Sequence, residues 1–142
     1  MEKIQKTSQS VILRLDAGEE LRATIEEFCA KENIHAAWVE AIGSTEELEL
    51  AYFDTHAKEY KTKRFEDFLE IVQASGNIAL KDGKPFAHLH GTFSRESMET
   101  LGGHIQKCVI SATAEVYLRP LEGHMERQYD DETGLFLLNP QT

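Results

Sequence analysis

Most of the chain consists of short apolar or alternating stretches separated by turn-forming residues, a pattern that predicts β-strands. Glu47–Asp54 shows it best, because Leu48, Leu50 and Tyr52 recur at every second position and would share one face of a strand. The strands predicted in this way are Ser8–Leu15, Ala36–Gly43, Glu47–Asp54, Tyr60–Phe65, Phe68–Leu80, Pro85–Phe93 and Val109–Leu118.

One segment near the N-terminus has helical spacing instead. Asp16, with Glu19 three residues later, is typical of a capping box, so we expect Asp16 to be the N-cap of a helix. Asn33 suits the left-handed position that follows a helix. The buried stripe of this helix would be formed by Leu21, Ile25, Phe28 and Cys29.

Glycines mark the predicted changes of direction. Asp82-Gly83 predicts a hairpin turn, and Gly76 predicts a bulge within its strand. Ser94–Leu101 is polar and predicts a short helix or a loop. Gly102-Gly103 would then break the chain just before His104 and turn it back toward the sheet.

Together these elements predict an α+β fold in a single domain spanning residues 1–142, with a mainly antiparallel sheet and one principal helix. The length of 142 residues suits one core.

No apolar stretch reaches the ~20 residues of a membrane span, so no membrane association is expected. The N-terminus lacks the apolar core of a signal peptide. Cys29 and Cys108 form no disulfide framework and are expected to be buried thiols, which favours the cytoplasm.

The net charge of −10 argues against a nucleic-acid-binding surface, because such binding depends on neutralising phosphates. One basic stretch stands out and contains Lys58, Lys61, Lys63 and Arg64. Its alternation favours a solvated edge strand over a DNA-binding patch.

The most concentrated chemistry in the sequence is a set of three histidines. His88 and His90 are two residues apart in a predicted strand and therefore project from the same face. His104 could join them through the predicted glycine turn. Three neutral imidazoles would bind a divalent transition metal, zinc by default, and leave one coordination position open. His35, His56 and His124 lie in helix-end, turn and tail contexts and are expected at the surface.

Other candidate residues are weaker. Glu115 lies in an apolar strand and could act as a base or orient a metal-bound histidine. Arg14, also among apolar residues, could bind an anion, although an ion pair with Glu115 explains it more simply. Cys108 could serve as a secondary thiolate ligand. Gly102-Gly103 could form an anion-binding nest, but a sharp turn is sufficient to explain both glycines.

A cupin-like barrel is the competing fold, because a His-x-His pair on a strand also resembles that family. Cupins place a glutamate four or five residues after the second histidine. Here those positions hold Ser94 and Arg95, and Glu96 is out of register. The cupin fold therefore ranks second.

Taken together, the motifs resemble the plants-and-prokaryotes-conserved (PPC) domain, and in particular its prokaryote-like members without an AT-hook. The resemblance implies a mainly antiparallel α/β fold, assembly as a homotrimer and a metal ion held by His88, His90 and His104. The matching segments are Leu13–Glu19, Ala36–Val39 continuing to Ser44, Ser75–Ile78, Asp82–Phe86, His88–His90, Gly102–His104 and Ala112–Val116.

The resemblance also implies DNA binding or regulation, but this implication transfers poorly. The sequence contains no AT-hook, and the plant-type Gly-Arg-Phe-Glu-Ile-Leu stretch appears as Asp67–Val72, which keeps Glu-Ile and loses Gly-Arg. The leading hypothesis is thus a homotrimeric metal-binding protein of a family associated with DNA. The alternatives are a small zinc-dependent enzyme of hydrolase or lyase type, and an oligomer that binds a small anionic ligand in the same pocket.

Overall fold

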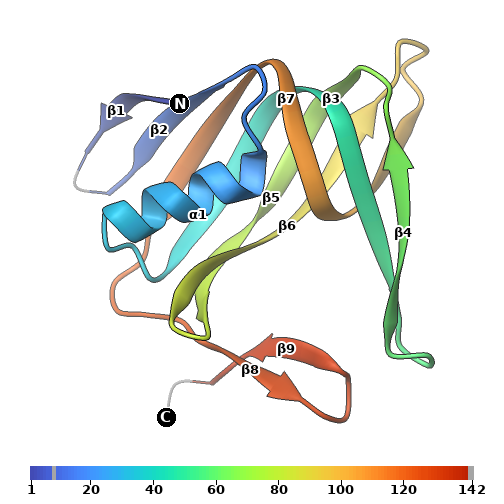
Figure 1. The fold of residues 1–142 in the computed structure, drawn as a ribbon. Coiled ribbons are helices and arrows are strands. Elements are labelled where there is room, and N and C mark those ends of the chain that lie inside the picture. Colours follow the sequence, from blue (N-terminus) through green and yellow to red (C-terminus); the bar gives the residue numbers. More distant parts are fainter. Residues whose placement is uncertain (8, 141–142) are drawn as a thin grey trace.

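Two long antiparallel strands, β3 (Ala37–Asp54) and β7 (Thr100–Pro120), organise the fold in a computed structural model that describes residues 1–7 and 9–140. Their pairing begins with Ala37 opposite Pro120 and ends with Ala51 opposite His104, and Figure 1 shows the two strands side by side. The remaining elements are β1 (Glu2–Lys6), β2 (Val11–Asp16), α1 (Leu21–Lys31), β4 (Glu59–Phe65), β5 (Leu69–Lys81), β6 (Lys84–Ser94), β8 (Arg127–Asp130) and β9 (Leu135–Leu138).

The main sheet has seven strands in the order β1-β2-β7-β6-β5-β3-β4, and β7 also pairs with β3. That additional pairing closes β3, β5, β6 and β7 into a ring, so each of these four strands has a strand neighbour on both sides over part of its length. Every pairing between strands of this sheet is antiparallel. The predicted fold class is therefore confirmed, and the cupin-like alternative is not the fold observed.

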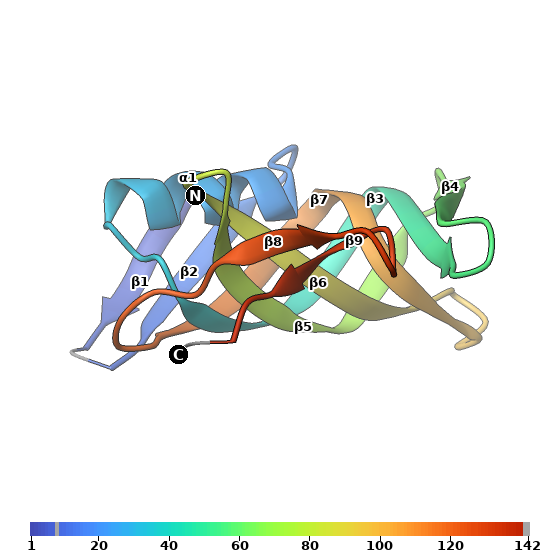
Figure 2. The same cartoon turned by 90° about the horizontal axis from the view of Figure 1, so that it is seen from below.

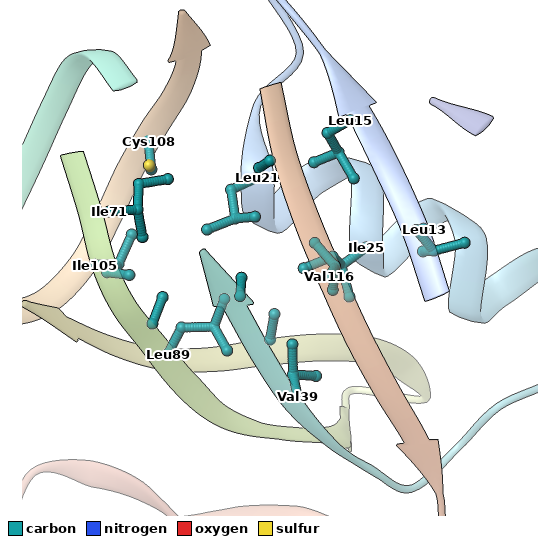
Figure 3. Close-up of a cluster of buried hydrophobic side chains, with 14 of the residues drawn as sticks. Leu13, Leu15, Leu21, Ile25, Val39, Ile71, Leu89, Ile105, Cys108 and Val116 are labelled. Carbon is teal, nitrogen blue, oxygen red and sulfur yellow. The ribbon is translucent and has the colours of Figure 1, made fainter. Parts of the chain in front are cut away.

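Side chains from the inner faces of these strands and from α1 form one core (Figure 3). The predicted stripe Leu21, Ile25, Phe28 and Cys29 is buried, and it packs against strand residues such as Leu13 and Val116. Burying a side chain of this size contributes about 1.5–3 kcal/mol. The helix therefore holds its position mainly through this apolar face.

Polar side chains of α1 also bond to sheet backbone where β6 and β7 diverge. Glu26 accepts a hydrogen bond from Ala87 N at 2.8 Å, and Arg22 Nε donates to Ala87 O at 3.1 Å. Glu20 accepts from Cys108 N at 3.0 Å. Since a buried backbone group without a partner is costly, the helix completes this part of the sheet.

The helix begins later than predicted. Its N-cap is Glu20, whose side chain accepts from Ala23 N at 2.7 Å, and not Asp16. Glu20 also pairs with Val109 across an isolated bridge, which keeps the chain extended up to that residue. Asp16 instead receives the N-terminal ammonium at 3.1 Å. Asn33 does take the left-handed conformation, with φ 54°.

Two glycine predictions were wrong. Gly76 is not at a bulge: it pairs regularly with Leu89, and a Cβ there would lie 1.8 Å from His88 O. Gly102 and Gly103 lie within β7 and do not turn the chain. They are needed for close approach, since a Cβ on Gly102 would lie 2.7 Å from Gly91 O. The turn at Asp82-Gly83 formed as expected, with φ values of 52° and 75°.

Other boundaries differ from prediction in simpler ways. Ala36–Gly43 and Glu47–Asp54 belong to one strand, β3, and β1 was not predicted. Residues 95–99 form a loop, the second of the two options for that region. Ser8, the predicted start of the next strand, lies outside the described residues. No helix in the described part of the chain is long and apolar enough to cross a membrane.

The C-terminal residues form a separate two-stranded hairpin, β8–β9. It lies next to the β5–β6 turn, and the view from below shows it crossing the strands of the main sheet (Figure 2). Leu80 N donates to Met125 O at 2.7 Å, and Lys58 Nζ donates to Asp131 O at 2.7 Å. These contacts attach the hairpin to both β5 and the β3–β4 turn.

Candidate metal centre

The three predicted histidines lie together on one side of the sheet. His88 and His90 are two residues apart in β6 and project from the same face. His104 in β7 is the direct cross-strand partner of His90. The ring centroids are 5.0 Å apart for His88–His90, 5.1 Å for His88–His104 and 5.3 Å for His90–His104. Strand pairing, and not a glycine turn, therefore brings His104 to the other two.

Their spacing suits a metal ion. One ring nitrogen from each histidine lies within 4.8 Å of the others, and the Nε2 atoms of His88 and His90 are 3.2 Å apart. Two nitrogens bound tetrahedrally to zinc at ~2.0–2.1 Å would be about 3.3 Å apart. Nδ1 of His104 is buried without a hydrogen-bond partner among the described residues, and a bound ion is one partner that would satisfy it. The donor set and its geometry thus fit the ion.

Burial keeps two of these imidazoles neutral. It lowers the pKa of His88 to about 4, with the Arg127 guanidinium as the next cause. Burial also lowers the pKa of His104 to about 4, followed by the nearby His88 and His90. Neutral imidazole is the form that binds metals, so both rings hold a free nitrogen lone pair at neutral pH.

A cavity of about 780 Å³ opens beside the histidines, and residues distant in sequence line it. Tyr60 of β4 stacks on the His104 ring, with centroids 5.2 Å apart and planes at 28°. The β9 segment forms another wall through residues such as Phe136. The histidines therefore face a partly open cavity with room for a small molecule.

Sequence reasoning missed Arg127, which reaches the site from the hairpin. Its Nη2 lies 3.3 Å from His88 Nδ1 and donates to Asn77 Oδ1 at 2.7 Å, while its Nη1 donates to Phe136 O at 3.0 Å. The one available signal was that Arg127 is the single Lys or Arg in the acidic tail 122–132. Nothing in the local sequence relates that tail to β6.

The structure does not bring Glu115 to the histidines. Glu115 is exposed on the outer face of the sheet and lines a different hollow, together with Ile42 and Val72. The predicted ion pair with Arg14 was wrong: the two are cross-strand neighbours, but Arg14 bonds to Glu2 at 2.9 Å and Asp16 at 3.2 Å. Glu2 in β1 is the cross-strand partner of Arg14, and Asp16 lies two residues further along β2.

The cysteines are core residues, as expected. Both are fully buried, and burial raises the pKa of Cys29 and of Cys108 to about 12. A thiol with such a pKa is a poor ligand, and Cys108 does not line the histidine cavity. His35, His56 and His124 are exposed, which confirms their surface placement.

The basic stretch is the exposed edge strand β4 and its preceding turn. Lys61 forms an ion pair with Asp54 at 2.6 Å. Arg64 bonds to Glu47 at 2.7 Å and to Glu66 at 3.0 Å. Lys61 and Arg64 are therefore paired with neighbouring carboxylates, which fits a solvated edge strand.

Comparison with known proteins identifies relatives of the whole chain. The sequence profile of the Plants and Prokaryotes Conserved (PCC) domain matches residues 2–122. No curated protein is similar enough to count as a match.

Three solved structures illustrate the likeness. A metal-containing protein from Archaeoglobus fulgidus is 38% identical, with 99% of each chain covered and a TM-score of 0.88. A plant- and prokaryote-conserved (PPC) protein from Pyrococcus horikoshii is 32% identical, covering 100% of this chain and 99% of that one, at a TM-score of 0.89. A protein from Bacteroides thetaiotaomicron, described as a candidate DNA-binding protein, is 25% identical. The match covers 95% of this chain and 94% of that one, with a TM-score of 0.91.

Proposed function

The chain belongs to the Plants and Prokaryotes Conserved (PCC) domain family, and on that premise we propose that it is a homotrimeric metal-binding protein. The metal would be held by His88, His90 and His104, with zinc as the preferred ion. The observation that carries this proposal is the convergence of three ring nitrogens within 4.8 Å of one another. The metal-containing relative from Archaeoglobus fulgidus supports it.

Zinc is preferred because imidazole is one of its common ligands and the Nε2 atoms of His88 and His90 have the spacing of two tetrahedral ligands. When bound, zinc would supply a Lewis-acidic position facing the cavity. The protein's own contribution is to keep His88 and His104 unprotonated through burial and to hold His104 against Tyr60.

Metal analysis of the protein purified without chelator tests the proposal. We expect about one zinc per chain after supplementation. His88→Ala, His90→Ala and His104→Ala should each weaken zinc binding by roughly 10-fold to 1000-fold, because each removes one of three ligands. His35→Ala, His56→Ala and His124→Ala are the matched controls and should retain it. A His90→Ala protein with full zinc content and unchanged affinity would contradict the site.

A small zinc-dependent enzyme is the second candidate, and the cavity beside the histidines is the observation that favours it. Glu115, the base expected from the sequence, does not line this cavity. No carboxylate of the described residues does so. A hydrolase or lyase reaction would therefore have to take its proton-accepting group from another residue type, and we place metal binding first.

DNA association is proposed to be weak. Relatives are described as DNA-binding candidates, but this chain has a net charge of −10, and Lys61 and Arg64 of β4 form ion pairs. We expect duplex binding without sequence preference that collapses between about 50 and 200 mM salt, as counterion release requires. Fluorescence anisotropy across that range measures it. Tight, salt-resistant binding of one sequence would overturn this expectation.

Self-association would use the outer face of the sheet. Ile42 and Val72 are 54% and 50% exposed there, and Tyr117 is 39% exposed beside them. A cluster of apolar side chains on a sheet surface is typical of a protein interface.

The buried thiols of Cys29 and Cys108 suit a reducing compartment, so we propose a cytoplasmic location.

A further inference from the structure

The cavity beside the histidines carries positive charge in an acidic protein. The chain has a net charge of −10, yet Arg22, Lys81 and Arg127 line this cavity and no Asp or Glu of the described residues does. Arg22 is occupied by backbone carbonyls, including Ala87 O at 3.1 Å and Gln106 O at 3.0 Å. Lys81 and Arg127 are therefore the cations left to act on a molecule in the cavity.

Neither of these two cations has a carboxylate partner within the described residues. Lys81 places Nζ 3.9 Å from the centre of the Phe136 ring and forms no ion pair. The partners of Arg127 are all neutral groups, namely Asn77 Oδ1, Phe136 O and His88 Nδ1, and its Nε is buried without a partner. A cation in a half-buried site normally requires an anion or several acceptors, and here part of that requirement is unmet.

A metal ion would free a further donor of Arg127. Nη2 of Arg127 lies 3.3 Å from His88 Nδ1, which can accept a hydrogen bond from it. If His88 binds the ion through Nε2, neutral His88 must carry its proton on Nδ1 and can no longer accept. Arg127 then has a donor at Nη2 that calls for an acceptor.

We propose that this cavity binds a small organic carboxylate, whose charged end lies between the metal and the Arg127–Lys81 pair. The proposal rests on the proposed metal-binding function. Arg127 matches the planar geometry of a carboxylate, and aromatic groups such as Tyr60 and Phe136 suit an apolar body. Arg127 and Phe136 come from the β8–β9 hairpin, which lies beyond the family match over residues 2–122. The carboxylate specificity would thus depend on the hairpin together with Lys81 of β5.

Calorimetric titration of the zinc-loaded protein with benzoate tests the proposal, with neutral benzamide as the comparison. Benzoate should bind and benzamide should bind at least tenfold more weakly. Arg127→Met and Lys81→Met should each weaken benzoate binding about tenfold, since each removes a charged partner. Arg119→Met removes a charge from an exposed site outside the cavity and should leave binding unchanged. Zinc content is measured in every sample.

The same measurements separate this proposal from the metal proposal. If zinc is bound one per chain but benzoate does not bind, or benzamide binds equally well, the carboxylate site is overturned while the metal site stands. If both Arg127→Met and Lys81→Met bind benzoate like the unchanged protein, it is overturned as well. If no zinc is retained, the metal proposal fails, and the placement of a carboxylate beside the metal fails with it.

Discussion

His104 shows how strongly burial shapes the individual histidines. Its side chain is the least exposed of the three, at 8%, and its Nδ1 has no partner among the described residues. His88 shares the lowered pKa and lies beside the Arg127 guanidinium. Both rings are thus stabilised in the neutral form, which is the form a metal requires.

The lowered pKa values predict how the stability of the metal-free protein depends on pH. The unfolded chain takes up protons on these histidines near pH 6.5, whereas the folded chain does so near pH 4. Their contribution is therefore complete above about pH 6.5 and is lost as the pH falls toward 4. We expect the melting temperature in chelator to fall over this interval.

His104→Gln provides the matched variant, because glutamine does not titrate. Its melting temperature should depend less steeply on pH between 6.5 and 4, whereas exposed His35→Ala should follow the unchanged protein. Parallel curves for all three proteins would show that His104 does not carry the effect.

At the level of elements, α1 is joined to the sheet by polar side chains as well as by its apolar stripe. Glu20 serves twice, because it caps the helix at Ala23 N and accepts from Cys108 N in β7. On the side of β7 that faces β6, the backbone N–H of Cys108 has no strand partner that could replace Glu20, because β6 pairs with β7 only up to His104.

Glu20→Ala should therefore be destabilising beyond the loss of a cap. A lost cap costs about 1 kcal/mol, and an unsatisfied buried N–H costs about 1–3 kcal/mol more. We expect the free energy of unfolding to fall by about 2–4 kcal/mol in chemical denaturation. Glu27→Ala, at an exposed position paired with Lys31, is the control and should change stability little. Equal effects of both variants would contradict a double role for Glu20.

For the whole molecule, the apolar outer hollow makes a prediction about assembly. Light scattering should give a mass near three times 16.1 kDa. Ile42→Glu combined with Val72→Glu should shift the protein toward monomer, because carboxylates would be buried at the interface. Tyr129→Glu, at a position 52% exposed on the hairpin and outside this hollow, should leave the mass unchanged. A stable monomer at micromolar concentration would refute the trimer.

The sequence by itself determined the features that depend on local periodicity. Alternation placed His88 and His90 on one face, helical spacing identified the stripe of α1, and Asp82-Gly83 specified its turn, because each depends on a few neighbouring residues. The order of the motifs along the chain was also sufficient to indicate the family.

Only the tertiary structure decided what depends on pairing between distant segments. Gly102 looked like a turn residue, but it is required because β7 passes so close to Gly91 O. His104 reaches His90 through strand register, and Arg127 reaches His88 through the docking of a hairpin from an acidic tail. Glu115, expected near the metal, lies on the other face of the sheet. Local spacing specifies which face a side chain takes, whereas register and docking determine which residues that face meets.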